Sequence, residues 1–403
     1  MEAFGYLVPY VLDWMNMLVR WLHVITGIAW IGASFYFVWL DNSLRPPAPG
    51  SDLAQKGVAG ELWAVHGGGF YNPQKYLVAP AELPAELHWF KWEAYSTWLS
   101  GFALLVIVYW LNAQAMMVDR SVADLSAWQA VGVGFGSLVA GWVVYDVLCR
   151  SPLGRHDLAF GVVVFSLLVG AAWGLTHVLG GRAAYIHVGA MIGTIMVANV
   201  AMVIIPGQRR MVEAMRAGLK PDPVYGIRGK QRSVHNNYFT LPVLFIMISN
   251  HFAMTYRHPH AWAVLAVIMA AGVFIRHFFN LRHKGRVEWI YPSVGVALLL
   301  GLAVALAPPR PAAGAGVPDF ARVETIIRQR CVSCHAAHPT QPGFASAPAG
   351  VMLDDAQGIA RNAPRIYQQA VQLKAMPLAN MTNMTEAERA QIAAWYESGA
   401  RTP

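Results

Sequence analysis

The stretch RWLHVITGIAWIGASFYFVWL, residues 20–40, decides the fold class, because it is long and apolar enough to cross a lipid bilayer as a helix. The whole chain has the same character, with 56% hydrophobic and 13% charged residues. An ordinary soluble chain carries about 25% charged residues. The sequence therefore predicts a membrane protein rather than a soluble one.

Eight segments of the chain, including this stretch, could span a membrane. A spanning helix needs about 20 mostly apolar residues, and each segment approaches or exceeds that length. We therefore predict an all-α fold, a polytopic bundle of about eight membrane helices. The segments are 14–40, 92–111, 127–149, 158–180, 183–206, 235–256, 260–280 and 288–307.

The basic residues predict how this bundle is oriented. Most lysines and arginines fall in the first, third, fifth and seventh loops, whereas the other three contain only Arg120, Arg182 and Arg257. Cytoplasmic loops carry the excess of positive charge, so both termini should lie outside. The net charge of +8 resides in these loops, which favours a bilayer as the partner and argues against nucleic acid.

A change in composition predicts a second domain. Residues 308–318 are rich in Pro, Ala and Gly and should form a linker between a membrane domain, 1–307, and a polar domain, 319–403. Helices are expected at 319–330 and 385–398. The second should begin with a capping box between Thr385 and Glu388 and end at Gly399.

The polar domain contains Cys331-Val-Ser-Cys334-His335, a C-x-x-C-H motif. Two thiols at this spacing add to the vinyl groups of haem, and the following His ligates the iron. A redox C-x-x-C would need a βαβ context, and a zinc site would need a second thiol pair, which Cys149 alone does not supply. We therefore predict covalent haem c and assign no role to Cys149.

The second iron ligand should come from further along the polar domain. Met376 precedes Pro377 in a loop ahead of the last helix, and this arrangement resembles class I cytochromes c, in which the ligand Met occupies such a loop. The resemblance covers 319–403 and assigns Met376, while His338 lies too close to His335. Haem is attached outside the bacterial membrane, so the domain should be periplasmic and the chain should lie in the inner membrane.

Ionisable residues inside a membrane are costly and point to function. With the expected orientation, four histidines lie near the outer face and could ligate a b-type haem, although interfacial or packing roles explain them equally well. Of these we single out His23, because residues 20–37 resemble the first helix of membrane haem proteins of the protoporphyrinogen-oxidase type. The four are His23, His177, His187 and His251.

A second group of polar residues lies near the predicted inner face. His88, Lys91, Trp92 and Tyr95 have the spacing of one helix face. Together with amides and an arginine, such groups suit a flat anionic heterocycle, although a membrane-interface belt of aromatic and basic residues is the alternative. The candidate catalytic residues are His88, Lys91, His235, Asn236, Asn237 and Arg276.

The whole arrangement resembles the bacterial membrane-bound urate oxidases, or urate hydroxylases, which fuse a urate-oxidase N-terminal membrane domain to a cytochrome c domain. The segments that carry the resemblance are residues 20–42, 61–71 (ELWAVHGGGFY) and 86–101 (ELHWFKWEAYSTWLSG). It implies two-electron oxidation of urate to 5-hydroxyisourate. The electrons would leave through the c haem to a soluble cytochrome or terminal oxidase of the respiratory chain.

In that scheme the inner group would carry the chemistry. His88 or His235 would remove a proton from urate, Lys91 or Arg276 would hold the anion, and Asn236 or Asn237 would bind the ring edge or orient water. Two other functions fit the sequence. One is a quinol- or gas-linked respiratory cytochrome, and the other is a non-catalytic electron-transfer or haem-handling membrane protein.

Overall fold

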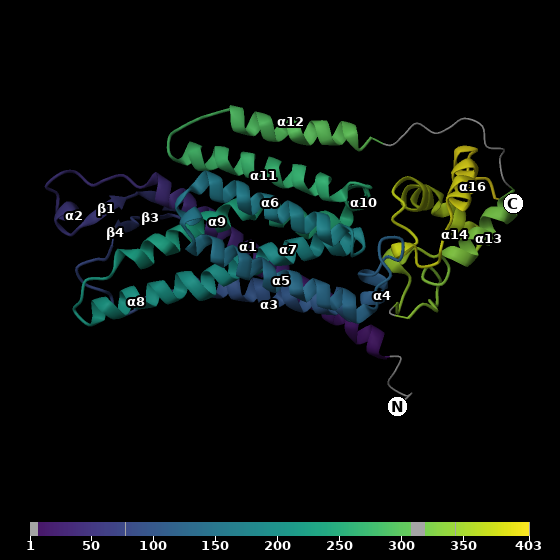
Figure 1. Ribbon diagram of the computed structural model, residues 1–403, viewed down its shortest axis with the longest axis horizontal. Helices are drawn as coiled ribbons and strands as arrows, with labels where there is room; N and C mark the ends of the chain where they lie inside the picture. The colour runs from purple at the N-terminus through teal and green to yellow at the C-terminus, as the bar shows by residue number, and fades with distance from the viewer. Residues whose placement is uncertain (1–6, 77, 308–318, 343, 403) are drawn as a thin grey trace.

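The computed structural model describes residues 7–76, 78–307, 319–342 and 344–402, and most of them are helical. They form two parts (Figure 1), an apolar bundle from α1 (Leu7–Ser43) to α12 (Ile290–Ala305) and a C-terminal unit from α13 (Phe320–Arg330) to α16 (Glu386–Glu397). Each part has its own hydrophobic core. The linker expected at 308–318 lies outside the described residues.

Among the described residues, five helices are long and apolar enough to cross a membrane. They coincide with five of the eight expected spans, and the last expected span is a shorter apolar helix, α12. Large apolar side chains are exposed over much of the bundle surface, as lipid-facing helices require. The five are Tyr10–Ser43, Ala127–Arg150, Asp157–Thr176, Gly181–Arg216 and Ala261–His283.

The second expected span is not a continuous α-helix. It consists of α3 (Trp92–Leu104) and a π-helical segment, η2 (Leu105–Trp110), so neither part reaches spanning length as α-helix alone. The next short helix is α4 (Ala113–Met116). The spacing that placed His88 and Lys91 on a helix face was wrong, because Lys91 has a non-helical backbone and the helix begins only at Trp92.

The sixth expected span is also shifted along the chain. Its helix, α9 (Pro223–Ile248), begins before residue 235, because Asp222 caps its first turn by accepting a hydrogen bond from the Val224 N–H. Proline at the first helical position supports the same start. The first half of α9 is therefore polar, and three short segments follow or flank it: η5 (Ser249–His251), α10 (Ala253–Tyr256) and η3 (Pro152–Arg155).

The central helix of the bundle is α7 (Gly181–Ala198), most of whose side chains are buried. It packs against α5 (Ala127–Arg150), α6 (Asp157–Thr176) and α9. Small residues permit close crossings, since a Cβ at Gly134 would meet His187 and one at Gly141 would meet Met191. A π-helical segment, η4 (Asn199–Ile204), continues α7 into α8 (Ile205–Arg216), and α11 (Ala261–His283) lies beside α12.

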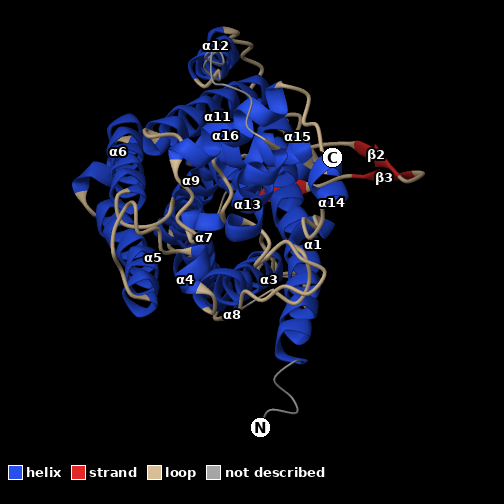
Figure 2. Cartoon of the chain, turned by 90° about the vertical axis from the view of Figure 1, so that its right-hand side faces the viewer, coloured by secondary structure: helices blue, strands red, loops and turns tan. Residues whose placement is uncertain are grey.

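The all-α prediction missed four short strands. β1 (Val58–Glu61) pairs with β4 (Gln74–Tyr76), and β2 (Ala64–His66) pairs with β3 (Gly69–Tyr71), both antiparallel. The second pair projects from the bundle (Figure 2). Gly67 and Gly68 form its turn with φ values of 57° and 80°, which glycine adopts readily, so the HGGGFY segment is a hairpin. The short helix α2 (Asp52–Gln55) precedes the strands.

The bundle has two ends that differ in what adjoins them. The proximal end carries α4 and α10 and lies next to the C-terminal unit, whereas the strands and the junction of α8 with α9 lie at the opposite, distal end (Figure 1). The first and fifth loops, two of those expected to be basic, thus lie at the distal end, away from the C-terminal unit. This arrangement fixes where polar sites lie relative to Cys331 and Cys334.

The C-terminal unit packs its helices around Trp395, whose side chain is 1% exposed. Both helices expected here are confirmed, as is the capping box, in which Thr385 and Glu388 exchange hydrogen bonds at the start of α16. Gly399 follows this helix with φ 103°. The remaining short elements are η6 (Pro348–Gly350), α14 (Ala356–Arg361), α15 (Ala363–Ile366), η7 (Tyr367–Gln372) and η8 (Leu378–Asn380).

Candidate functional site

Polar side chains of α9 form two separate networks toward the distal end of the bundle. One, which we call the Arg232 network, joins α9 to α5 and η4. Arg232 is 4% exposed and pairs with Asp146 at 2.7 Å, and it also donates to Asn199 at 3.2 Å. Asn199 in turn donates to Asn236 and to the Tyr145 hydroxyl at 2.9 and 3.0 Å. The buried cation therefore has its counter-charge within the chain.

His235 belongs to the Arg232 network and is held by aromatic residues. Its Nδ1 lies 2.7 Å from the Tyr145 hydroxyl and its ring stacks on Phe160, with centroids 4.6 Å apart. The same hydroxyl accepts a hydrogen bond from Asn199. Cys149 is buried with its Sγ 3.9 Å from the same Nδ1. His235 and Tyr145 thus form a hydrogen-bonded pair inside the Arg232 network.

The second set, the Arg276 network, joins α9 to α11 and α1. Arg276 is 5% exposed, donates through Nε to Asn237 at 2.5 Å, and lies with its guanidinium 4.1 Å from the centre of the Phe35 ring. Asn237 donates to Asn280 at 2.9 Å. The Nη2 atom of Arg276 is buried without a hydrogen-bond partner among the described residues. Unlike Arg232, Arg276 has no carboxylate beside it among the described residues.

A tyrosine and a histidine adjoin the Arg276 network. The Tyr238 hydroxyl lies 2.6 Å from Nδ1 of His277, and His277 meets the ring of Tyr291 on α12 edge to face at 4.5 Å. A tyrosine–histidine pair therefore stands on each side of α9. Either pair offers a proton acceptor to a bound molecule.

Two candidate residues lie apart from both networks. His88 is exposed in the loop before α3 and contacts the ring of Phe90, while Lys91 lies over Trp92 at 5.6 Å. Each contact is typical of an aromatic and basic belt. The nearby Glu93 has a buried Oε2 with no partner among the described residues. The structure therefore does not bring His88 and Lys91 together with Arg276, Asn236 and Asn237.

The four histidines singled out as haem b candidates occupy different surroundings. His187 has both ring nitrogens engaged, since Nδ1 donates to Ala183 O at 2.8 Å and Nε2 accepts from Trp110 at 3.1 Å. His177 and His251 are exposed. His23 donates from Nδ1 to Thr97 O at 3.0 Å, which leaves Nε2 as an acceptor, the arrangement common in metal-ligating histidines.

In the C-terminal unit, the residues predicted to hold haem c line one cavity. His335 donates from Nδ1 to Val351 O at 3.0 Å, so its Nε2 carries a lone pair. Burial raises the pKa of Cys331 to about 12, and burial also raises the pKa of Cys334. The cavity is otherwise largely apolar and is lined by Arg330, Cys331, Cys334, His335, Phe344, Pro348, Met376, Pro377, Leu378, Met381 and Thr382.

These residues fit a covalently bound haem. Two reduced thiols, a histidine with a free Nε2 and a thioether share an apolar wall, which is the donor set that c-type haem requires. Met381 lines the cavity as well, whereas Met384 is 3% exposed in the core and Met352 is exposed. His338 is exposed and is absent from the cavity wall.

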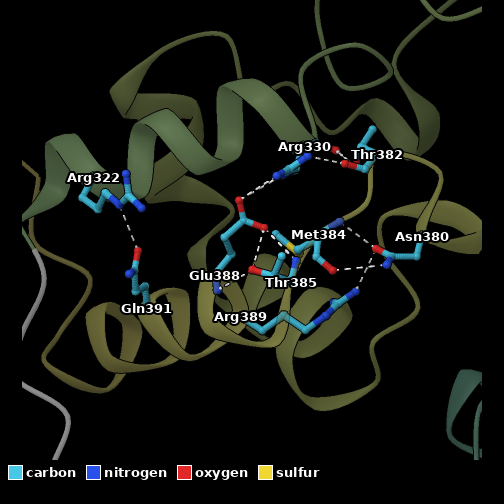
Figure 3. Close-up of polar contacts among 9 residues, drawn as sticks. All are labelled: Arg322, Arg330, Asn380, Thr382, Met384, Thr385, Glu388, Arg389 and Gln391. Carbon is cyan, nitrogen blue, oxygen red and sulfur yellow. Dashed lines mark hydrogen bonds and ion pairs between the residues drawn. The ribbon is translucent and has the colours of Figure 1, made fainter.

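Two arginines fix the loop that carries Met376. Arg389 is 4% exposed and donates to the backbone carbonyls of Met376, at 2.8 Å, and Ala370. Arg330 donates to Glu388 at 2.9 Å and to the Thr382 carbonyl (Figure 3). Charge-assisted hydrogen bonds from a buried and a half-buried arginine to carbonyls and a carboxylate restrain this loop. Met376 is thereby held in the wall of the cavity that it shares with His335 and both cysteines.

The same loop contacts the bundle. Ala375, next to Met376, is 4% exposed and belongs to the bundle's core cluster, and Leu373 packs against that cluster. The segment η8 contacts α4 at the proximal end. The cavity lined by Met376 and the C-x-x-C-H motif therefore lies beside the bundle, on the face that touches it.

Several residues of these sites were missed in the sequence. Asp146 could have revealed the Arg232 network, because it is a carboxylate within a predicted span and such residues need partners. Its partner Arg232 was assigned to a loop, since the early start of α9 was not recognised. Asn199 and Tyr145 gave no signal of their own. Phe35 and Ala375 could not be identified as site residues from the sequence, because their roles depend on tertiary contacts.

The comparisons with known proteins give one match. A family model described as Urate oxidase N-terminal matches residues 9–307, which is most of the chain and includes the entire set of residues from Phe35 to Arg276 discussed above. No curated protein and no solved structure matches the chain.

Proposed function

The chain belongs to the urate oxidase N-terminal family, and we propose that it is a membrane-bound enzyme that oxidises urate to 5-hydroxyisourate. The electrons pass to a haem c held by Cys331, Cys334, His335 and Met376, and from there to a soluble cytochrome or terminal oxidase. The bundle spans the bacterial inner membrane, with its proximal end and the C-terminal unit in the periplasm.

One observation carries this proposal beyond a general urate-related oxidation. The Met376 loop both lines the cavity with the C-x-x-C-H motif and packs against the bundle that the family model matches. A haem bound in that cavity would supply one-electron acceptance. A substrate-oxidising bundle and an electron acceptor in direct contact suit an oxidase that delivers electrons to a respiratory chain.

The overall reaction sets what the residues must do. Urate takes up one water molecule and releases two protons and two electrons to give 5-hydroxyisourate. A buried site must therefore hold an anion, accept protons and position water. The two networks flanking α9 contain these functions, with Arg276 and Asn237 to bind the ring, and His235 and His277 as proton acceptors.

The distance between these networks and the haem motif favours an intermediate electron carrier. His235 lies about 20 Å from the proximal end of α9, at 1.5 Å per residue. We propose a haem b within the bundle, with His23 as one ligand, because its Nδ1 is already bonded to Thr97 O. His187 is the weakest of the four candidates, since both of its nitrogens are engaged.

A variant without the covalent attachment site tests the proposed function. Membranes containing the Cys331→Ser, Cys334→Ser double variant should not consume urate, whereas wild-type membranes should consume it without releasing hydrogen peroxide. Immunodetection of the chain in the membrane fraction controls for expression. Urate consumption by the double variant at the wild-type rate would contradict a route through haem c.

A further inference from the structure

One of the two networks beside α9 contains a buried cation that has no carboxylate partner among the described residues. Arg232 and Arg276 are both about nineteen-twentieths buried, with exposures of 4% and 5%. Arg232 faces Asp146 at 2.7 Å. Arg276 has only neutral neighbours in its contacts with Asn237 and Phe35, and its Nη2 makes no hydrogen bond to any described residue. The two arginines thus differ in kind.

A buried cation without a partner is better explained by ligand binding than by a role in packing. An unpaired charge removed from water is strongly unfavourable, and ionisable groups inside membrane proteins pair or line a functional pathway. A hydrogen-bond donor left unsatisfied adds to the cost. Arg276 has both an unpaired charge and an unsatisfied hydrogen-bond donor. An anion bound to it would remove both unfavourable contributions at once.

The neighbours of Arg276 determine which anions fit. Phe35 covers one face of the guanidinium at 4.1 Å, and Asn237 occupies Nε. Asn280 holds Asn237 in place by accepting from its amide at 2.9 Å. The donors that remain are those of the terminal nitrogens, which lie in the guanidinium plane and favour a planar acceptor with oxygen or nitrogen at its edge.

We propose that Arg276 binds a planar, monoanionic heterocycle by its edge, with Asn237 and Asn280 as positioning residues. On the proposed function, which this inference presupposes, that heterocycle is urate. The substrate site is thereby assigned to the α9–α11–α1 side of the bundle. The Arg232 network, whose cation is already paired with Asp146, does not bind the anion.

Equilibrium dialysis of purified protein against urate, with haem c first reduced by ascorbate under anaerobic conditions, measures binding without turnover. Arg276→Gln should weaken urate binding by about tenfold or more, and Arg276→Lys by less. Arg209→Gln, on the exposed face of α8, is the matched control and should bind as the wild type does. Wild-type binding should persist in a large excess of chloride.

Asn237→Asp should change thermal stability and urate affinity in opposite directions. The new carboxylate would pair with Arg276, so thermal stability should be maintained or raised while urate affinity falls by about tenfold or more. A purely structural arginine would give the gain in stability without the loss of binding. This variant also keeps the inference testable if Arg276→Gln fails to accumulate.

Unchanged urate affinity in Arg276→Gln or Asn237→Asp would overturn the assignment, as would displacement of urate by chloride. These outcomes differ from a failure of the proposed function, in which urate would not reduce haem c in the wild-type protein at all.

Discussion

Met376 and Met381 both line the cavity beside Cys331, Cys334 and His335, but their surroundings differ. The carbonyl of Met376 is fixed by Arg389 at 2.8 Å. We expect Met376→Ala to retain covalent haem, because both thiols remain, and to lose the spectroscopic signature of thioether ligation. Magnetic circular dichroism of the ferric protein measures this change.

Met381→Leu is the matched control for that experiment, since it removes a sulfur from the same cavity. Its ligation spectrum should equal that of the wild type. A thioether signal that survives in Met376→Ala and disappears in Met381→Leu would transfer the ligand role to Met381. At this scale the motif could be predicted from sequence, because spacing alone relates Cys331, Cys334 and His335, whereas the choice of Met376 rested on the resemblance to class I cytochromes c.

Between elements, the Asp146–Arg232 pair joins α5 to α9 and should contribute strongly to stability. Removing one partner of a buried ion pair leaves an uncompensated charge and costs about 3–5 kcal/mol. We therefore expect Asp146→Asn to lower the thermal unfolding temperature of the purified protein markedly. The double variant Asp146→Asn, Arg232→Gln should recover part of the loss, and equal losses in the two variants would argue against the pairing.

The first turn of α16 gives a second prediction at this scale, on pH. Burial would raise the pKa of Glu388, but hydrogen bonds from the Thr385 backbone and from Arg330 outweigh it and hold that pKa below its usual range. The carboxylate therefore stabilises the unit above the pKa of an unfolded glutamate, about 4.3. That stabilisation is lost as the pH falls through the lower pKa of the folded state.

Glu388→Gln should consequently unfold at a lower temperature than the wild type near neutral pH, by the equivalent of at most about 1 kcal/mol, the usual range for a partly exposed ion pair. The difference should close under strongly acidic conditions. Loss of the thioether-ligation signal, which belongs to haem c, follows unfolding of this unit. Glu386→Gln, an exposed residue in the same turn, should show a smaller difference, and a deficit in Glu388→Gln that is independent of pH would refute the charge argument.

Sequence patterns identified most elements but placed some of them incorrectly. The capping signals of α16 were local and were recognised, whereas Asp222 and Pro223 gave α9 an earlier start than hydropathy suggested. Hydropathy also missed the strands between Val58 and Tyr76, because segments this short carry little periodic signal. The consequence was to treat Arg232 as a loop residue and to overlook its network.

For the whole molecule, contact between the Met376 loop and the bundle should control electron transfer. Ala375 is 4% exposed at this contact, so Ala375→Arg should separate the two parts without altering the cavity residues. We expect urate-driven haem reduction to slow by about tenfold or more while reduction by dithionite is unchanged, because an arginine does not fit this site. Stopped-flow absorbance measures both rates.

Ala321→Arg, on the exposed side of α13, is the control and should behave as the wild type does. A normal urate-driven rate in Ala375→Arg would show that the contact is not needed. This level of organisation could not be predicted from the sequence. A buried alanine in a polar loop has no signature, and the split of the inner residues into two networks depends on how α1, α5 and α11 surround α9.

The most direct test of the account as a whole is anaerobic addition of limiting urate to the purified, oxidised protein while the c-haem absorption is recorded. Because urate releases two electrons and each haem accepts one, we predict that one urate reduces about two haems, counted over the haem c at Cys331 and Cys334 and the proposed haem b. Absence of reduction by urate in protein that a quinol or dithionite does reduce would contradict the account.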